Sequence, residues 1–424
     1  MKTEWNRLDN AAMMFPSAAY KTENNMFRFT CELNDDEDID PDILQTALDE
    51  TLESFDVFRC VLKRGIFWYY LENSDLRPVV KAEYKKLCDK IYDKKIKSLL
   101  FEVTYFRNRI NLEVFHVLSD GTGSTHFLTM IVSRYLSIKY NLKVPPISYD
   151  ASYNQMQEDS FHKYYTGKMK ERIKQRPMAC QLRGTRYADN RLRIITGTMS
   201  VKKVVALSRE KQATVTSYMA ACLLNSIGED ITMKQRKKPV ALCIPVNLRN
   251  YFPSQSARNF FTKFILEYDY LHDSNDFDEV LNKVLLDFKN KLTFDYLSDV
   301  LNWYTAAAHN PFAKIAPLFF KDIVLKAAYW KSKLQATATL SNVGVIKLPD
   351  ELEKYIKNFS VASSSVNIQA CICSYNDNLS VSFTTPFINS DIERRFFRMF
   401  TSNGIDVEIT SNTEGLEAYG KNLR

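Results

Sequence analysis

The chain has 424 residues, of which 45% are apolar and 25% charged, and its formal net charge is +7. This composition is typical of a globular protein, and the length exceeds one ordinary core, so we expect two domains or two closely packed halves. The 11 glycines and 13 prolines are too few for a disordered chain or for glycine-rich phosphate loops. Acidic residues interrupt most lysine-rich runs, which argues against a nucleic-acid partner.

The cysteines and the apolar runs indicate the compartment. Eight cysteines are scattered along the chain without a Cys-x-x-Cys pair. We therefore expect buried free thiols and no metal site. The first residues form no apolar leader, and no run reaches the length of a membrane span. These features predict a cytoplasmic protein without a transmembrane segment, and we expect a monomer.

The first half of the chain alternates strand and helix patterns. Its apolar alternation predicts strands over 26–33, 56–62, 66–71, 101–106 and 109–116. We expect helices ending near residue 55 and over 84–99, the second of them rich in lysine. A hairpin turns at Arg107-Asn108, where asparagine tolerates the left-handed backbone.

Residues 150–190 lack clean periodicity and are interpreted as a crossover linker, after which a second series begins. Predicted helices cover 201–210, 215–227, 276–292, 313–331 and 391–401. Predicted strands cover 191–200, 238–247, 260–270, 336–341, 358–364, 368–375, 379–384 and 406–409. Both halves share this α/β pattern, so we predict two similar folds, residues 1–185 and 186–424.

Aromatic residues and lysines alternate within residues 313–333, where Phe319, Phe320, Tyr329 and Trp330 lie. An ordinary packed helix is the favoured interpretation. An amphipathic helix on a membrane surface is the alternative.

The most informative segment is residues 115–123, because it delivers one of only five histidines into a strand-to-helix turn. Strand periodicity places His116 on the same face as Ile110, Leu112 and Val114. An Asp120-Gly121 turn follows, and then an amphipathic helix with Ser124 or Thr125 available as N-cap. We expect the glycines to allow a sharp turn and to leave open space beside the ring.

A neutral imidazole at such a place suits general-base catalysis, in which it takes a proton from a hydroxyl or amine. A structural histidine is the competing interpretation, and metal or ligand binding is a further one. Asp120 could orient the ring or pin the loop to an arginine, and we favour the second role. The pattern alone is weak, since His272 and Asp276 repeat the spacing within a polar loop.

Several motifs together resemble the CoA-dependent acyltransferase superfamily, which includes condensation domains and alcohol acetyltransferases. They are Trp5…Leu8-Asp9-Asn10, 65–70, His116 through Gly121, Pro245 to Arg249, 258–261 and 340–344. The resemblance is strongest to the bacterial alcohol-acetyltransferase-like proteins. It spans most of the chain in the expected order.

The resemblance implies two chloramphenicol-acetyltransferase-like halves, each a mixed sheet with helices, forming a V around a central tunnel. Acyl-CoA would be a co-substrate rather than a bound cofactor, and His116 would be the catalytic base. The small-molecule acceptor would be an alcohol or amine. Asp120 takes the place of the motif's conserved aspartate, which is usually structural. Phe115 stands where condensation domains generally carry a second histidine, and the plant DFGWG motif has no clear counterpart.

Other polar residues near predicted strand ends are candidates for substrate, oxyanion or structural support. They are Gly121, Asn247, Arg249, Asn259, Ser341 and Asn342. For Asn247, Arg249 and Asn259, satisfying loop backbone is the favoured interpretation, and Arg249 could equally partner Asp120. For Ser341 and Asn342, structural capping is favoured. Ser363 to Ser365 resemble an oxyanion serine only loosely. The basic run 163–176 could receive the phosphates of CoA.

The leading hypothesis is acyl transfer from CoA to an alcohol or amine by direct attack on the thioester. No cysteine or serine has an evident activating base, which agrees with a mechanism without an acyl-enzyme. One alternative is a non-catalytic relative that binds a ligand or carrier protein. Another is a condensation-type enzyme that uses a carrier-protein thioester. A hydrolase is disfavoured because no Gly-x-Ser-x-Gly motif occurs.

Overall fold

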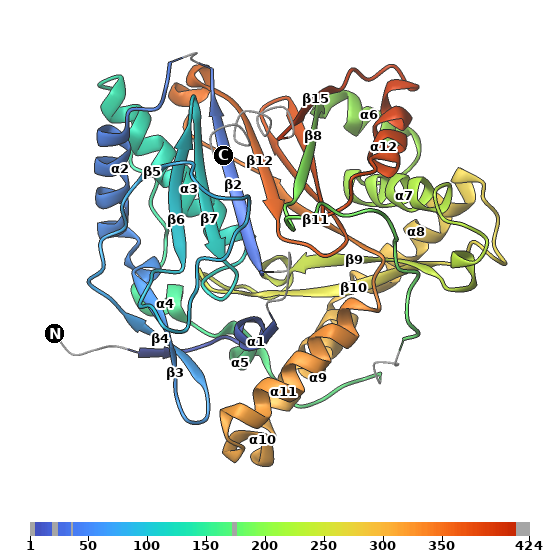
Figure 1. The fold of residues 1–424 in the computed structure, drawn as a ribbon, viewed down its shortest axis with the longest axis horizontal. Coiled ribbons are helices and arrows are strands. Elements are labelled where there is room, and N and C mark those ends of the chain that lie inside the picture. Colours follow the sequence, from blue (N-terminus) through green and yellow to red (C-terminus); the bar gives the residue numbers. More distant parts are fainter. Residues whose placement is uncertain (1–4, 19–23, 35–36, 172–175, 413–424) are drawn as a thin grey trace.

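The computed structural model describes residues 5–18, 24–34, 37–171 and 176–412, and two sheets dominate it (Figure 1). Within these residues the first sheet has five strands in the order β12-β2-β7-β6-β5. All pairs are antiparallel except β5 with β6. The strands are β12 (Ile356–Ser363), β2 (Met26–Leu33), β7 (Arg109–Phe115), β6 (Phe101–Phe106) and β5 (Lys81–Ala82). Helices α2 (Pro41–Ser54) and α3 (Gly121–Lys139) pack against each other beside this sheet.

The second sheet has seven strands in the described residues, in the order β10-β9-β11-β13-β14-β8-β15. It is mixed, because β11 runs parallel to both β9 and β13. The strands are β8 (Arg193–Ser200), β9 (Val240–Asn247), β10 (Phe261–Tyr268), β11 (Ala338–Val345), β13 (Ile368–Tyr375), β14 (Asn378–Thr385) and β15 (Glu408–Ser411). Its helices are α6 (Val201–Glu210), α7 (Val215–Gly228), α8 (Phe277–Lys291) and α12 (Asp391–Thr401).

One strand crosses between the halves. β12 lies late in the chain, yet it pairs with β2 over Ile356↔Leu33 to Ser363↔Phe27 and so extends the first sheet. β13, which follows it, belongs to the second sheet. The division at residues 185 and 186 stays a prediction, and β12 is an element of the second segment that the first sheet contains.

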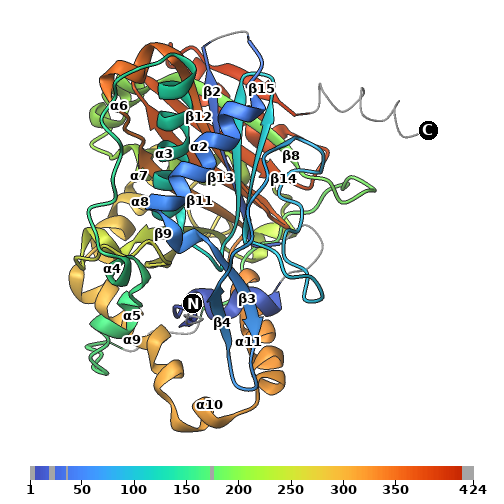
Figure 2. The same ribbon diagram turned by 90° about the vertical axis from the view of Figure 1, so that its left-hand side faces the viewer.

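A third group of elements lies at one end of the molecule (Figure 2). The hairpin of β3 (Cys60–Arg64) and β4 (Tyr69–Asn73) pairs with β1 (Trp5–Arg7). The short helices α1 (Phe15–Ala18), α4 (Tyr153–Gln157) and α5 (Ser160–Tyr164) lie nearby. Helices α9 (Phe294–His309), α10 (Pro311–Ile315) and α11 (Leu318–Lys333) complete this end.

The structure confirms the mixed α/β class and most predicted elements, and α6 and α12 have the predicted bounds. All eight cysteines are buried and unpaired, as expected. Helix α9 was not predicted. The predicted helix at 313–331 is two helices that meet at Pro317, because proline lacks the amide hydrogen that a continuous helix needs.

Two predictions in the first half were wrong. Residues 84–99 form no helix, because the segment is fastened to the buried carboxylate of Glu113. The amide of Cys88 and the ammonium of Lys85 both contact that carboxylate, at 3.0 and 3.3 Å. The β6–β7 turn lies at Arg107-Asn108 as predicted, but Arg107 rather than the asparagine takes positive φ, at 51°. The side chain of Asn108 instead donates to the carbonyl of Leu33.

Candidate active site

His116 directly follows β7, at a place where side chains of both sheets meet. Its imidazole lies between two phenyl rings that stack on its faces. Phe15 of α1 is 4.5 Å away between ring centroids, and Phe261 of β10 is 5.1 Å away. Phe27 of β2 meets the ring edge-on at 4.4 Å. Side chains from both sheets and from α1 therefore enclose the His116 ring.

The hydrogen bond of the ring determines its tautomer. His116 Nδ1 lies 3.0 Å from the carbonyl oxygen of Ser119. A carbonyl can only accept, so we assign the ring proton to Nδ1. Nε2 then keeps its lone pair, which a general base requires.

The surroundings of the ring also favour its neutral form. Burial among apolar rings lowers the pKa of His116 to about 4, because it penalises the imidazolium. The Ser119 carbonyl and the charge of Asp120 act in the opposite direction but are outweighed. At neutral pH the imidazole is therefore free to accept a proton.

The carboxylate of Asp120 has a structural role, because every contact described for it fixes the turn or joins it to the second sheet. Oδ1 accepts from the amides of Thr122 and Gly123, so Asp120 is the N-cap of α3 and the predicted caps Ser124 and Thr125 were wrong. Oδ2 accepts from Arg249 Nη1 at 2.7 Å and from the amide of Phe260 at 2.9 Å. None of these contacts is with the His116 ring.

Arg249 and Asn247 connect the end of β9 to the same turn. Arg249 donates to Asp120 and also to the carbonyls of Ser256 and Arg258. Asn247 Oδ1 accepts from the Arg249 amide, while its Nδ2 donates to Thr122 Oγ1 at 3.1 Å. The side chain of Asn247 thus supports the turn on which His116 depends.

Asn259 links the histidine to a buried carboxylate that sequence reasoning did not single out as functional. Its Nδ2 donates to the carbonyl of His116 at 3.1 Å and to Asp9 Oδ2 at 3.0 Å. Burial and the nearby charge of Asp159 raise the pKa of Asp9 to about 7. Asp9 occurred in the quoted motif Leu8-Asp9-Asn10, but a lone acidic residue near a terminus carries no signal of burial.

The glycines of the turn have different surroundings. Neither Gly121 nor Gly123 has positive φ, so the turn does not use the left-handed backbone. A Cβ on Gly123 would lie 2.5 Å from the carbonyl of Ala257, so this glycine allows the 257 segment to approach α3 closely. A Cβ on Gly121 would meet only Val343, at 3.8 Å, which leaves space beside the turn.

The late-strand candidates lie on β11, whose Val343 faces Gly121. Asn342 donates to Thr216 Oγ1 and accepts from the amide of Gly344, so its amide fastens the strand end. Ser341 is half-buried and pairs in register with Cys371. Ser364 Oγ accepts from the amides of Asn24 and Met26, which favours its structural interpretation.

Other sequence candidates lie apart from His116. His272 pairs with Asp269, not Asp276, in an exposed loop. In the basic run, Lys163 and Lys170 pair with Glu158 and Asp295, and residues 172–175 lie outside the described part. Within the described residues, no group of three acidic, histidine or cysteine side chains could hold a metal ion.

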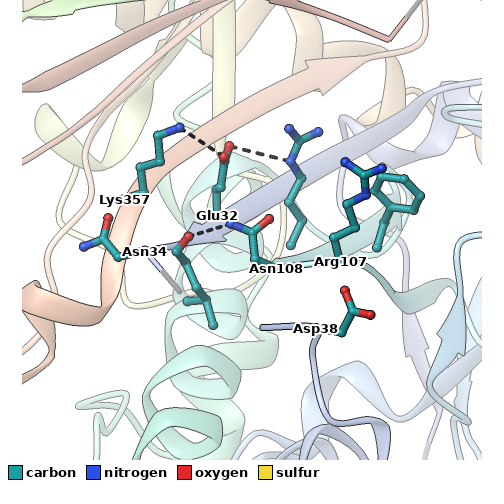
Figure 3. A pocket seen from close by; sticks show the side chains of 9 residues that line it. Glu32, Asn34, Asp38, Arg107, Asn108 and Lys357 are labelled. Atoms are coloured by element: carbon teal, nitrogen blue, oxygen red, sulfur yellow. Dashed lines mark hydrogen bonds and ion pairs between the residues drawn. The ribbon is translucent and has the colours of Figure 1, made fainter. Parts of the chain in front are cut away.

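An open surface pocket of about 730 Å³ lies at the far end of β2 and β7 (Figure 3). Arg109 lines it, and at about 3.3 Å per strand residue it is roughly 20 Å from His116. Glu32 within the pocket is already paired with Lys357 and Arg109. This pocket is therefore separate from the candidate active site.

Comparison with known protein families identifies the class of this chain. A family model of alcohol acetyltransferases matches residues 151–403. The chain belongs to the alcohol acetyltransferase family. The match includes Asn247, Arg249 and Asn259, whereas His116 precedes it. No curated protein sequence matches significantly.

Solved structures of acyltransferases and condensation domains share the two-lobed fold of this family member. TRI101 of F. graminearum, complexed with coenzyme A and T-2 mycotoxin, is 10% identical with a TM-score of 0.62, over 92% of this chain and 96% of that one. The first condensation domain of the CDA synthetase is 12% identical with a TM-score of 0.58, over 93% and 95%. Polyketide synthase associated protein 5 of Mycobacterium tuberculosis is 13% identical with a TM-score of 0.56, over 92% and 96%. These likenesses confirm the predicted fold class.

Proposed function

We propose that this chain is an acyltransferase that moves an acetyl or other acyl group from acyl-CoA to an alcohol or amine, with His116 as general base. The observation that carries the proposal is the bond from His116 Nδ1 to the Ser119 carbonyl, which leaves Nε2 unprotonated. The family match supports acyl transfer as the reaction class. The neighbour TRI101, solved with coenzyme A, supports CoA as the donor.

The reaction proceeds by direct attack. Nε2 takes the proton of the acceptor hydroxyl or amine while the acceptor atom bonds to the thioester carbonyl carbon. The tetrahedral intermediate then breaks its C–S bond, and the imidazolium returns the proton to the CoA thiolate. The products are the ester or amide and free CoA. Asp120, Arg249, Asn247 and Asn259 hold the loop of His116, and Gly121, Ser341 and Asn342 remain candidates for substrate or structural support.

The acceptor and donor would approach His116 through a tunnel between the halves, in a cytoplasmic, monomeric enzyme. No helix in the described part of the chain has the length and apolarity to cross a membrane. A carrier-protein thioester is the alternative donor, because condensation domains share the fold.

The test follows CoA thiol release from acetyl-CoA with a panel of alcohols and amines. We expect acceptor-dependent release that His116→Ala lowers by ~10²–10⁴-fold. His272→Ala is the matched control, since it removes a histidine from the second occurrence of the same spacing and should leave the rate unchanged. Release that is independent of acceptor, or equal in both variants, contradicts the proposal. Transfer from an acetylated carrier protein alone would establish the condensation-type alternative.

A further inference from the structure

Helices α10 and α11 extend below the sheets, at the end of the molecule opposite β15 (Figures 1 and 2), and they carry an apolar ridge. We define the ridge as Phe312, Ile315, Phe319, Phe320, Ile323 and Val324. Phe312 is 80% exposed, Ile315 71% and Val324 66%. Scattered exposed apolar residues are ordinary, but six exposed apolar side chains within residues 312–324 mark an interaction surface.

The ridge is distinct from the face by which α11 packs. Residues 319, 320, 323 and 324 share one side of the helix because residues three and four apart are neighbours. Leu318 and Tyr329 are the buried residues of α11, at 4% and 6% exposure. The helix therefore needs no contact through the ridge for its own fold.

The β3–β4 hairpin holds the ridge in place and extends it. The amide of Leu318 donates to the carbonyl of Ile66 at 2.8 Å, and Lys321 Nζ donates to the carbonyl of Phe67. Lys321 also lies 3.8 Å from the ring centroid of Trp68. Ile66, at the hairpin tip, is itself 76% exposed. The apolar surface is thus built on two anchored elements.

The charge around the ridge has one sign. Residues 311–334 contain five lysines and a single acidic residue, Asp322. The negative charge of Asp322 is offset by Arg64, whose Nη2 lies 3.5 Å away, and the same carboxylate accepts from Tyr69 Oη at 3.1 Å. Lys314 and Lys326 are exposed beside the apolar side chains. The surface therefore combines apolar anchors with a positive border.

We propose that this ridge docks the protein onto the surface of a lipid bilayer that contains anionic lipids. Apolar side chains bordered by lysines match the boundary between acyl chains and negative headgroups. A symmetric contact between two copies would bring two surfaces with positive borders together, and this like charge disfavours a second copy as the occupant. The ridge would enter one leaflet of the bilayer without crossing it.

The same helix reaches the candidate active site at its other end. Tyr329 Oη donates to Asn25 Oδ1 at 2.8 Å, and the carbonyl of Asn25 accepts from the amide of His116. Tyr329 lies about 15 Å along α11 from Phe319 at 1.5 Å per residue. A bilayer on the ridge would therefore lie on the α1–α11 side of the molecule.

The test is flotation of the purified full-length chain with phosphatidylcholine vesicles, with and without about a quarter phosphatidylglycerol. We expect flotation with the anionic vesicles, weakened by salt. Phe319→Ser with Phe320→Ser should lower the partition coefficient at least about tenfold. Lys314→Gln with Lys326→Gln should lower it by about fivefold for each lysine.

Matched controls come from exposed residues of the other lobe. Met233→Ser with Leu286→Ser removes two exposed apolar side chains, and Lys283→Gln with Lys289→Gln removes two exposed charges. Both control pairs should float like the wild type, and thermal melting checks that every variant is folded. Absence of wild-type flotation, or equal flotation of ridge and control variants, overturns the proposal. A dimer by light scattering that Phe319→Ser with Phe320→Ser dissolves, without flotation, assigns the ridge to a second copy and also overturns it.

Discussion

Arg249 Nη1 lies 2.7 Å from Asp120 Oδ2, which joins the end of β9 in the second sheet to the first turn of α3 beside the first sheet. The two side chains are only 10% and 6% exposed. Arg249 also donates to two carbonyls of the 256–258 segment, and Asp120 accepts from the amide of Phe260. Removing either partner would leave a buried charge without its counter-ion.

We therefore expect Asp120→Ala and Arg249→Ala each to lower the free energy of unfolding by ~3–5 kcal/mol. The double variant should lose less than the sum, because the second removal relieves the orphaned charge of the first. Urea unfolding of the four proteins measures the coupling. The exposed pair Lys203 and Asp406 is the control, since removing it should cost only ~0–1 kcal/mol. Strictly additive losses at Asp120 and Arg249 would contradict the role of the pair.

The depressed pKa of His116 predicts the acid limb of the activity profile. The unprotonated ring is the active form, and burial lowers its pKa from 6.5 to about 4. Consequently kcat/KM should show no inflection near 6.5 and should fall tenfold per unit only below about pH 4. Initial rates after brief pH jumps measure the profile, and recovery at neutral pH controls for unfolding. An acid limb near 6.5 would show that the ring is solvated.

Phe261 provides a test of what causes that depression. Its ring stacks on His116 at 5.1 Å, so Phe261→Ala should admit water and raise the pKa of the imidazole toward 6.5. The acid limb of kcat/KM should move upward with it, and lost stacking should cost ~0.5–1.5 kcal/mol of stability in addition to lost burial. Phe261→Leu keeps an apolar cover and should leave the limb near its original position. Identical profiles for both variants would assign the depression to other neighbours.

Asn259 should stabilise the fold more at high pH than at low pH. The pKa of Asp9 is raised from 3.8 to about 7, so folding favours the protonated carboxyl. The stability that this preference contributes is fully present below pH 3.8 and is lost as pH rises through about 7. Above pH 7 the carboxylate is ionised and depends on its donors, of which Asn259 Nδ2 is one. Asn259→Ala should therefore cost ~1 kcal/mol at pH 5 and ~2–3 kcal/mol at pH 8. A cost that does not change with pH would contradict the raised pKa.

Much of the fold was predictable because the spacing of apolar residues indicates which face of each helix or strand is buried. Helices α6 and α12 have the predicted bounds, since their apolar spacing and flanking residues are local signals. The helix predicted at 84–99 failed because long-range contacts to Glu113 outweighed helix propensity. The crossing of β12 into the first sheet was also beyond local patterns, because strand partners are chosen by tertiary packing.

The candidate site likewise has features that the sequence predicted and others that depend on tertiary packing. Alternation along β7 and the Asp-Gly turn pointed to His116 as a candidate base, and the second-half motif supplied Arg249 as a candidate partner for Asp120. The sequence contained no signal that Asp9 would be buried against Asn259, or that Phe15 and Phe261 would enclose the ring. These contacts join residues that are roughly a hundred or more positions apart.

The sequence by itself determined that this is an α/β protein with an acyltransferase-like set of motifs. The reason is that the apolar periodicity of strands and helices, and the order of the motifs, can be read directly from the residues. Tertiary structure alone decided the tautomer of His116, its pKa of about 4 and the ion pair of Asp120. It also decided that Phe312 of α10 and Phe319 and Phe320 of α11 lie outside the core, whereas Tyr329 of the same helix is buried. The reason is physical: hydrogen-bond direction, desolvation and exposure depend on which distant residues pack together, and periodicity specifies only which side of an element is buried.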